Sequence, residues 1–340
     1  MRPALLLLLC PALCLAAETI LFDTDSGFFG DDGASLVMLL RRPDKVRIAG
    51  ITVVSGNVWA RQGAEYMFHI LRLLDRPDVP LYLGAQAPLV HTAAMSRQEG
   101  KLEFAGAFAD PPDRVQPPHG GRFSGLKPQS QPAVDFLIEA IERNPGQITF
   151  LALGPMTNLA IALRLRPDLE TKILRLVFMG GQIRAAGNAS RAAEFNFWFD
   201  PEAAQAVLRS RIPEKVMFGL DICNQALLTR RHYDELVSVP TPLTDLIRED
   251  MGVRYPGFLT KPKAILPMWD SLAAAWFLDP EFVTSERSLR LDVVTRFGPR
   301  YGSVIALDSK LAPQATPVRV MLTLDFPRVF RLYKELLALR

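Results

Sequence analysis

Short apolar runs alternate with helical segments along most of this chain, and that alternation limits its possible folds more than any other feature. Six runs are typical of buried strands, at residues 20–22, 46–54, 79–83, 148–153, 173–179 and 216–220, with two more candidates at 289–296 and 318–324. Apolar residues at helical spacing follow many of them, at residues 36–40, 58–74, 132–143 and 201–208, after Pro155 and from residue 326 onward. Strands that alternate with helices form a parallel sheet covered by helices. The sequence therefore predicts an α/β, Rossmann-like fold with a mostly parallel central sheet flanked by helices.

The composition fits one large globular domain. The 340 residues are enough to bury an extensive core, and 49% of them are apolar. The net charge is only +3, which gives no sign of a nucleic-acid or membrane-surface partner. No linker or internal repeat divides the chain, so we expect a single domain over residues 18–340.

The first 17 residues differ from the rest and have the pattern of a secretory signal peptide. Arg2 gives a positively charged start, residues 5–9 are all leucine, and Ala16 and Ala17 are small residues of the kind found at a cleavage site. This segment is too short to span a membrane, and a buried first strand is the alternative interpretation. We therefore expect a secreted or periplasmic protein. Only Cys223 would remain after cleavage, so no internal disulfide is expected.

Polar residues follow strand after strand. Asp23 and Asp25 come at the end of the first strand, Asn57 after the second, Gly154 after the fourth and Asp221 after the sixth. The carboxyl ends of parallel strands lie along one edge of a sheet, which is where ligands bind in such folds. An irregular segment at residues 84–130, rich in Pro and Gly, is long enough to be a lid over that edge.

Four carboxylates lie within ten positions after the first strand, at Asp23, Asp25, Asp31 and Asp32. Clustered carboxylates repel one another unless a cation or hydrogen bonds neutralise them. Calcium, which takes about six to eight oxygen ligands, fits such a cluster, whereas no His or Cys has zinc-site spacing. The plain alternative is that these acids only cap a helix and complement its dipole.

Other polar residues would converge on the same edge and could complete a hydrolytic site. A distant acid such as Asp270 could close an oxygen cage with Asp25 and Asp32, and a carboxylate base beside the ion would activate water. The side chains that suit vicinal hydroxyl groups are Asp31, Asn57, Asn188, Glu194 and Asn196. Together they indicate attack of water on the anomeric carbon of a sugar, although Glu194 and Asn196 could also be ordinary loop residues.

These residues carry a resemblance to a known family. The matching pieces are DTDSG…DD at 23–32, VSGN at 54–57, LGPMTN at 153–158, FMGG at 178–181, GNASRAAEFN at 187–196, DPEAA at 200–204, GLD at 219–221 and WDSLAAAWFLDP at 269–280. The chain resembles the nucleoside hydrolases of the inosine-uridine preferring superfamily, calcium-dependent enzymes that cleave the N-glycosidic bond of ribonucleosides into ribose and free base. The resemblance covers essentially the whole chain after residue 22.

The resemblance implies a role for each matching residue. Asp25 matches the calcium ligand that also acts as general base, Asp32 and Asp270 match further ligands, and Leu153 matches the position whose backbone carbonyl binds calcium. The positions that bind the nucleoside are matched by Asp31, Asn57, Asn188, Glu194, Asn196 and Asp221. Asp23 matches a residue that supports the loop. Family members form dimers or tetramers, so a homodimer or homotetramer is expected by analogy.

Two departures from the family pattern matter. Phe28, Phe29 and Gly30 make the loop before Asp31 two residues longer than in many members. Trp269 stands where members that hydrolyse inosine and uridine alike carry the His that protonates the leaving base. The Trp-Asp pair is similar to the purine-preferring, inosine–adenosine–guanosine class, in which aromatic rings stack on the base. The sequence thus favours a purine nucleosidase that salvages bases, with Phe104 or Phe108 as the second aromatic.

Several alternatives remain at this point. Asp23-Thr24-Asp25 after a strand also fits a haloacid-dehalogenase-type phosphatase, which would use magnesium and leave Glu194 and Trp269 without a role. An exported nucleoside- or sugar-binding protein without turnover is the non-enzyme alternative. His91 and His119 could act as acids from the candidate lid, but solvated loop histidines are commoner. Asn188-Ala189-Ser190 is a glycosylation sequon that we expect to lie in the pocket and stay unmodified.

Overall fold

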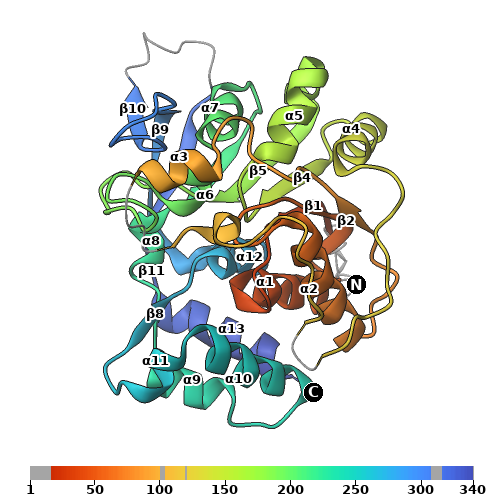
Figure 1. Cartoon of the computed structure of the whole chain (residues 1–340), viewed down its shortest axis with the longest axis vertical. Helices are drawn as coiled ribbons and strands as arrows, with labels where there is room; N and C mark the ends of the chain where they lie inside the picture. Colours follow the sequence, from red (N-terminus) through yellow and green to blue (C-terminus); the bar gives the residue numbers. More distant parts are fainter. Residues whose placement is uncertain (1–16, 100–103, 119–120, 308–315, 340) are drawn as a thin grey trace, which may run out of the picture.

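A computed structural model describes residues 17–99, 104–118, 121–307 and 316–339 (Figure 1). The predicted signal peptide, apart from Ala17, lies outside the described residues. Within the described ranges, no helix combines the length and the apolar character that crossing a membrane requires. The single cysteine in these ranges, Cys223, is buried and has a free thiol.

A nine-stranded sheet with the order β10-β9-β11-β6-β5-β4-β1-β2-β3 forms the centre of the molecule. The strands from β11 to β3 in this order all run parallel, whereas β9 is antiparallel to both β10 and β11. The strand bounds are β1 Glu18–Thr24, β2 Val46–Val53, β3 Leu81–Leu83, β4 Ile148–Ala152, β5 Ile173–Met179, β6 Lys215–Phe218, β9 Val283–Val293, β10 Val304–Leu307 and β11 Val318–Leu324. The predicted parallel α/β sheet is confirmed.

Helices cover both faces of the sheet, as Figure 1 shows with α4, α5 and α7 above it and α1, α12 and α13 below. The larger helices are α1 Gly30–Leu40, α2 Ala60–Leu73, α4 Ala133–Arg143, α5 Thr157–Leu165, α7 Pro201–Arg209, α12 Asp270–Leu278 and α13 Phe326–Ala338. Each face has its own apolar core. The central strands are buried on both sides, which is why their sequences are continuous apolar runs instead of alternating ones.

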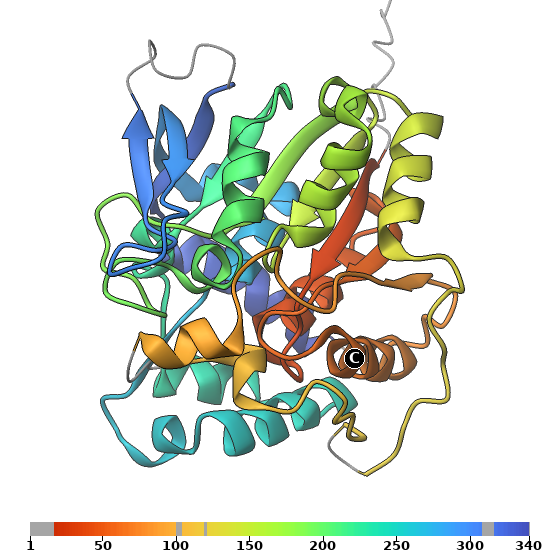
Figure 2. The ribbon, with the colours of Figure 1, turned by 45° about the horizontal axis from the view of Figure 1, so that its top comes forward.

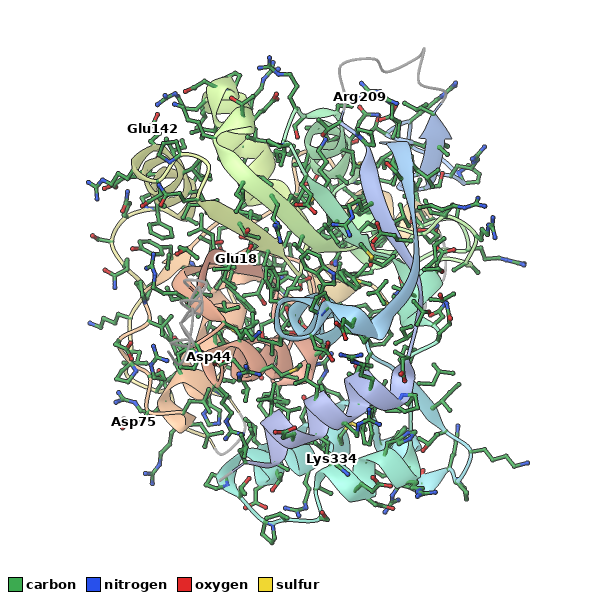
Figure 3. All side chains as sticks on the ribbon, turned by 180° about the vertical axis from the view of Figure 1, so that it is seen from behind. Glu18, Asp44, Asp75, Glu142, Arg209 and Lys334 are labelled. Atoms are coloured by element: carbon green, nitrogen blue, oxygen red, sulfur yellow. The ribbon has the colours of Figure 1, made fainter. Side chains whose placement is uncertain are left out.

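A smaller helical layer lies beyond α13 and contains α9 Arg230–Leu236, α10 Pro242–Arg254 and α11 Pro256–Thr260. The short antiparallel pair β7 Leu227–Thr229 and β8 Ile265–Pro267 connects it to α12. Thr241 caps α10 by accepting from the Thr244 N–H, which satisfies a donor that the helix itself leaves unpaired. Seen from behind in Figure 3, α13 crosses next to this layer, and its Lys334 pairs with Glu235 of α9 at 3.3 Å. The layer is therefore anchored to α13.

The segment predicted as an irregular lid is only partly irregular. It contains α3 Ala93–Gln98 and the 3-10 helix η1 Gly106–Ala109 (orange to yellow in Figure 2). Other short elements were not predicted either, among them α6 Phe195–Phe199, α8 Leu220–Cys223 and β10. All are too short for a periodic apolar pattern to be recognised, because fewer than two turns or two pleats leave little to count.

Candidate active site

The carboxyl ends of β1, β2, β4 and β5 meet at a cavity of about 510 Å³. Its lining residues are Asp31, Asn57, Phe104, Leu153, Met179, Asn188, Glu194, Phe195, Asn196, Arg254, Tyr255, Trp269 and Asp270. Nine of these are residues that the sequence indicated as ligand- or metal-binding, Phe104 among them as a candidate aromatic, and they come from six separate stretches of chain. The expected convergence at one edge of the sheet is therefore present.

Three carboxylates form a group that could hold a metal ion. Asp31, Asp32 and Asp270 each offer an oxygen, and these oxygens lie within 4.8 Å of one another. The Asp270 N–H donates to Asp31 Oδ2 at 3.0 Å, which joins the start of α12 to the start of α1 across 239 positions. Asp270 Oδ1 is buried and has no hydrogen-bond partner. A buried acceptor without a donor is costly, so this oxygen is well suited to a cation.

Asp25 is completely buried and is neither one of these three carboxylates nor one of the residues that line the cavity. Besides burial, repulsion from Asp32 and Asp31 raises its pKa, which shows that Asp25 lies near the group. Its two carboxylate oxygens accept from the backbone N–H and the side-chain amide of Asn57, at 2.8 and 3.0 Å. A Cβ atom at Gly56 would overlap the Asp25 carboxylate, and one at Gly154 would lie 2.8 Å from Asp25 Cβ. The glycines that follow β2 and β4 are thus required by how closely their backbones approach this side chain.

The electrostatics of the acidic residues favour a bound cation. Burial, with repulsion from Asp32, raises the pKa of Asp25 well above its usual range, and burial with repulsion from Asp31 does the same for Asp270. Burial and the neighbouring Asp31 raise the pKa of Asp32 to about 7, although Thr24 donates a hydrogen bond to it. A hard ion held by oxygens would reverse these shifts by neutralising the ionised forms. The donor set, all oxygen, fits such an ion.

Asp23, which the resemblance assigned to supporting the loop, bonds to neighbouring elements of the fold. Its Oδ1 accepts hydrogen bonds from the hydroxyl of Thr52 on β2 and from the side-chain amide of Asn158 on α5, the latter at 2.7 Å. Burial nevertheless raises the pKa of Asp23 to about 7. The side chain does not line the cavity, and it ties β1 to its neighbours directly behind Asp25.

Two predicted hydroxyl-binding residues, Glu194 and Asn196, are buried and belong to the short helix α6. Glu194 caps α6 by accepting from the Asn196 and Phe197 N–H groups, and it also accepts from Gly181. Burial raises the pKa of Glu194 to about 7. The Asn196 amide donates to the carbonyl oxygens of Leu153 at 3.0 Å and of Met179 at 3.1 Å. Leu153 lines the cavity, and its carbonyl oxygen accepts from Asn196, so its role as a calcium ligand stays a prediction.

The other two polar candidates differ from each other. Asn188 lines the cavity while its Oδ1 accepts from the Phe195 N–H at 2.8 Å. Asp221 does not line the cavity. Its carboxylate accepts from the backbone N–H groups of Ile183, Arg184 and Ala185, so it holds the loop after β5 in place. A direct contact between Asp221 and substrate thus has no support from this geometry.

Four aromatic side chains line the cavity, namely Trp269, which precedes Asp270 in the chain, Tyr255, Phe104 and Phe195. The ring centroids of Phe104 and Phe195 are 5.0 Å apart. Of the two proposed second aromatics, Phe104 therefore faces the cavity. Phe108 instead stacks on Phe199, with ring centroids 4.6 Å apart.

His91, a histidine of the candidate lid, does not line the cavity. His91 is buried and not solvated, contrary to expectation; its Nδ1 lies 3.0 Å from the Trp198 carbonyl oxygen. Burial lowers the pKa of His91 to about 4, so it is neutral near pH 7. His119 lies outside the described residues. Among the residues that line the cavity there is no histidine to protonate a leaving group.

A family model for the inosine-uridine preferring nucleoside hydrolases matches residues 20–331 of this chain. The chain belongs to this family. It is an enzyme that hydrolyses ribonucleosides, as the sequence predicted. Family membership therefore argues against the two alternative functions, a phosphatase and a binding protein without turnover. An acidic cluster of the kind found at the carboxyl edge is what a metal-dependent member of the family needs.

Individual relatives of this nucleoside hydrolase differ in their named substrates. The pyrimidine-specific ribonucleoside hydrolase RihA of Salmonella enteritidis is 32% identical over 280 residues, which cover 80% of this chain and 83% of RihA. A solved inosine-guanosine nucleoside hydrolase superposes with a TM-score of 0.75 at 25% identity, covering 94% of this chain and 98% of that one. A plant nucleoside hydrolase shares the fold, with a TM-score of 0.78, 24% identity and coverage of 95% and 99%.

Four cavity residues of this nucleoside hydrolase were not predicted from the sequence. Met179 and Phe195 could have been found, because Met179 ends β5 and Phe195 lies between two predicted residues. Arg254 and Tyr255 could not, because they end α10 in the outer helical layer and follow no strand of the central sheet.

Proposed function

We propose that this nucleoside hydrolase uses calcium to hydrolyse purine ribonucleosides into ribose and free base. The observation that carries the proposal is that one cavity is lined both by members of the carboxylate group, Asp31 and Asp270, and by aromatic side chains. Trp269 and Asp270, which are adjacent in the chain, bring the two kinds of side chain together.

The residues that would hold calcium are Asp25, Asp32, Asp270 and the carbonyl of Leu153, with Asp31 close enough to contribute. Calcium accepts about six to eight oxygens in irregular arrangements, which suits a group drawn from three chain segments. When bound, the ion supplies positive charge that keeps the surrounding carboxylates ionised and favours the ionised form of nearby water.

Asp25 would act as the general base. In the reaction, the water oxygen forms a bond to the anomeric carbon while its proton passes to the Asp25 carboxylate. The C–N bond breaks, and its electron pair leaves with the purine. The departing purine takes up a proton from solvent. The two hydrogen bonds from Asn57 orient the Asp25 carboxylate for this transfer. A positioned base contributes roughly 10²–10⁴-fold to such reactions.

The ribose would be held by the polar residues that line the cavity. Asp31 and Asn57 lie at the carboxylate end, where vicinal hydroxyl groups would meet them. Asn188, Glu194 and Asn196 line the same cavity from the segment between β5 and α7. Hydrogen bonds to hydroxyl groups that strengthen as positive charge develops on the sugar stabilise the transition state of glycoside cleavage.

The purine preference rests on the aromatic end of the cavity. A base stacked on Trp269 would gain roughly 1–3 kcal/mol, and the larger purine ring offers more surface to stack than a pyrimidine. Tyr255, Phe104 and Phe195 line the same space. Stacking matters more here because the described lining contains no histidine to donate a proton to the departing base.

A substrate panel tests this proposal. Purified protein is incubated with inosine, guanosine, uridine and cytidine, with calcium and with a chelator, and free ribose is measured. We expect faster release from the purine nucleosides and loss of release in chelator. Faster release from uridine or cytidine, as the name of the RihA relative would suggest, would reject the purine preference while leaving the calcium-dependent reaction intact.

We further infer export of the protein and a homodimeric or homotetrameric state. The basis for export is the leucine-rich start described above. Sequencing the amino terminus of protein recovered from the producing cell's exterior or periplasm tests cleavage near residue 17. Light scattering on the purified protein measures the oligomeric state.

A further inference from the structure

The lengthened loop before Asp31 has a backbone that needs outside support. Phe28 has φ 54° and Gly30 has φ 52°, both in the left-handed region. Non-glycine residues adopt this conformation rarely, because the Cβ atom crowds the backbone. The loop precedes Asp31 and Asp32 directly, so its conformation determines where these carboxylates lie.

The support comes from the last turn of α10. An Arg254 guanidinium N–H donates to the carbonyl oxygen of Gly27, and a Cβ atom at Gly30 would lie only 2.6 Å from Arg254 Nη1. One turn earlier, the carboxylate of Asp250 lies near the N–H groups of Phe29 and Gly30, which favour its ionised form against burial. Asp250 Oδ1 is 3.8 Å from Arg254 Nη1. An ion pair on one helix therefore holds both ends of the inserted segment.

Arg254 also reaches the cavity. Its Nη2 lies 3.3 Å from the hydroxyl oxygen of Tyr255, and both residues line the cavity. Its positive charge lowers the pKa of Asp32, against the larger effect of burial. One guanidinium thus touches the loop that carries the carboxylates and the wall that faces the substrate. A lysine could not make both contacts, because it has a single ammonium group instead of a planar fork of donors.

We propose that Arg254 is a positioning residue that links cation binding at Asp31, Asp32 and Asp270 to the ordering of the cavity wall at residues 250–259. This inference rests on the proposed calcium site and adds to it a coupling through α10. Binding of calcium that fixes the loop at residues 26–32 also fixes Gly27 and Gly30, and Arg254 passes that constraint to Tyr255. Coupling of this kind is reciprocal, so an ordered wall strengthens cation binding by the same factor.

Amide hydrogen exchange on the full chain tests the coupling. Exchange is followed in peptides that cover residues 26–32 and 250–259, in chelator and with calcium alone, for the natural protein and for Arg254→Lys and Arg254→Gln. The matched control is Arg248→Gln, since Arg248 is on the same helix but contacts Asp245 and the Val237 carbonyl instead of the cavity. Calcium affinity of each variant is measured by calorimetry.

We expect calcium to slow exchange in both segments of the natural protein and of Arg248→Gln, and only at residues 26–32 in the two Arg254 variants. Calcium affinity falls by about fivefold or more in Arg254→Lys, which keeps the positive charge, so lost coupling accounts for the change. If calcium slows exchange in both segments of a folded Arg254 variant, the inference is overturned. The same holds if calcium slows exchange only at residues 26–32 in the natural protein. No effect of calcium at residues 26–32 in the natural protein would reject the calcium site itself and the coupling with it.

Discussion

The two ends of the cavity are built in different ways. At the carboxylate end, Asp25 and Asp32 follow the central strand β1 and are buried, and glycines pack directly against Asp25. At the aromatic end, Phe104 and Tyr255 come from segments outside the sheet, and Phe104 is 45% exposed. In the proposed mode of binding, the buried carboxylate end, the rigid end of the site, would act on the ribose that every ribonucleoside has, and the outer segments would face the base. The specificity of such an enzyme can therefore change while the chemistry is kept.

The largest expected effect is a loss of turnover when Asp25, at the rigid carboxylate end, is substituted. Asp25→Asn keeps the volume of the side chain but removes the proton acceptor, and it replaces one of the two oxygens that accept from Asn57 with an NH2 donor. We expect kcat to fall by about 10²–10⁴-fold with a much smaller change in KM, because the interaction lost acts in the transition state. Inosine turnover at saturating calcium measures it. An Asp25→Asn variant with near-normal kcat would mean that another group is the base.

Trp269→Ala tests the aromatic end. We expect kcat/KM for inosine to fall by roughly 10-fold to 100-fold, as losing about 1–3 kcal/mol of stacking implies, and kcat/KM for uridine to fall less. Trp276→Ala is the matched control, because Trp276 lies on α12 beneath Arg175 and Arg319 and not at the cavity. Equal losses for inosine and uridine in Trp269→Ala would show that Trp269 packs without selecting the base.

The close packing behind Asp25 predicts a stability effect. Gly56→Ala places a Cβ atom against the Asp25 carboxylate, so we expect unfolding to become easier by about 1–3 kcal/mol, as in other overpacked sites. Denaturant titration measures the free energy of unfolding. Gly252→Ala in α10 is the control, because nothing lies within 4 Å of its Cβ position, and there a gain of up to about 1 kcal/mol is expected. Similar effects at the two glycines would contradict the described contact.

A smaller effect concerns pH and separates the metal-free from the metal-bound protein. Burial raises the pKa of Asp23, Asp32 and Glu194 to about 7, from ordinary values of 3.8, 3.8 and 4.5. Between about pH 4 and 7 these carboxyl groups are protonated in the folded state but ionised in the unfolded state. The folded state therefore binds more protons, so its stability in chelator should fall as pH rises from about 4 to 7. The low pKa of His91, about 4, opposes this trend by a single group.

Calcium should reverse part of this dependence, because it favours the ionised form of the same carboxylates. Thermal unfolding across that pH range, with calcium and with chelator, measures both curves. The stabilisation by calcium should grow as pH rises, and Asp23→Asn should flatten the curve in chelator. Parallel curves with and without calcium would place the ion away from these acids.

Much of the rigid end could be predicted from the sequence and less of the aromatic end. The strands are apolar runs, and their ends must meet, so Asp31, Asn57 and Leu153 could be brought together without coordinates, and the family resemblance added Asp270. Arg254 and Tyr255 could not be, because the position of an outer helix depends on packing that has no periodic signal.

Local hydrogen bonds also limited the prediction. Asp221 matches a family position, yet its carboxylate is taken by three backbone N–H groups that no sequence pattern indicates. His91 was expected in solvent because its segment is irregular, but it packs against Trp198 and Tyr301, with ring centroids 4.8 and 5.1 Å away. Burial inside an irregular segment is a property of the tertiary structure.

The central claim is that calcium at the carboxylate end enables Asp25 to activate water, and a calcium titration tests it most directly. Metal-depleted protein receives increasing calcium while ribose release from inosine and heat of binding are followed, with Asp270→Asn measured alongside. The account predicts that activity returns in step with the binding of one ion per chain, and that Asp270→Asn needs much more calcium. Full activity in the metal-depleted protein, or calcium binding without any return of activity, would contradict it.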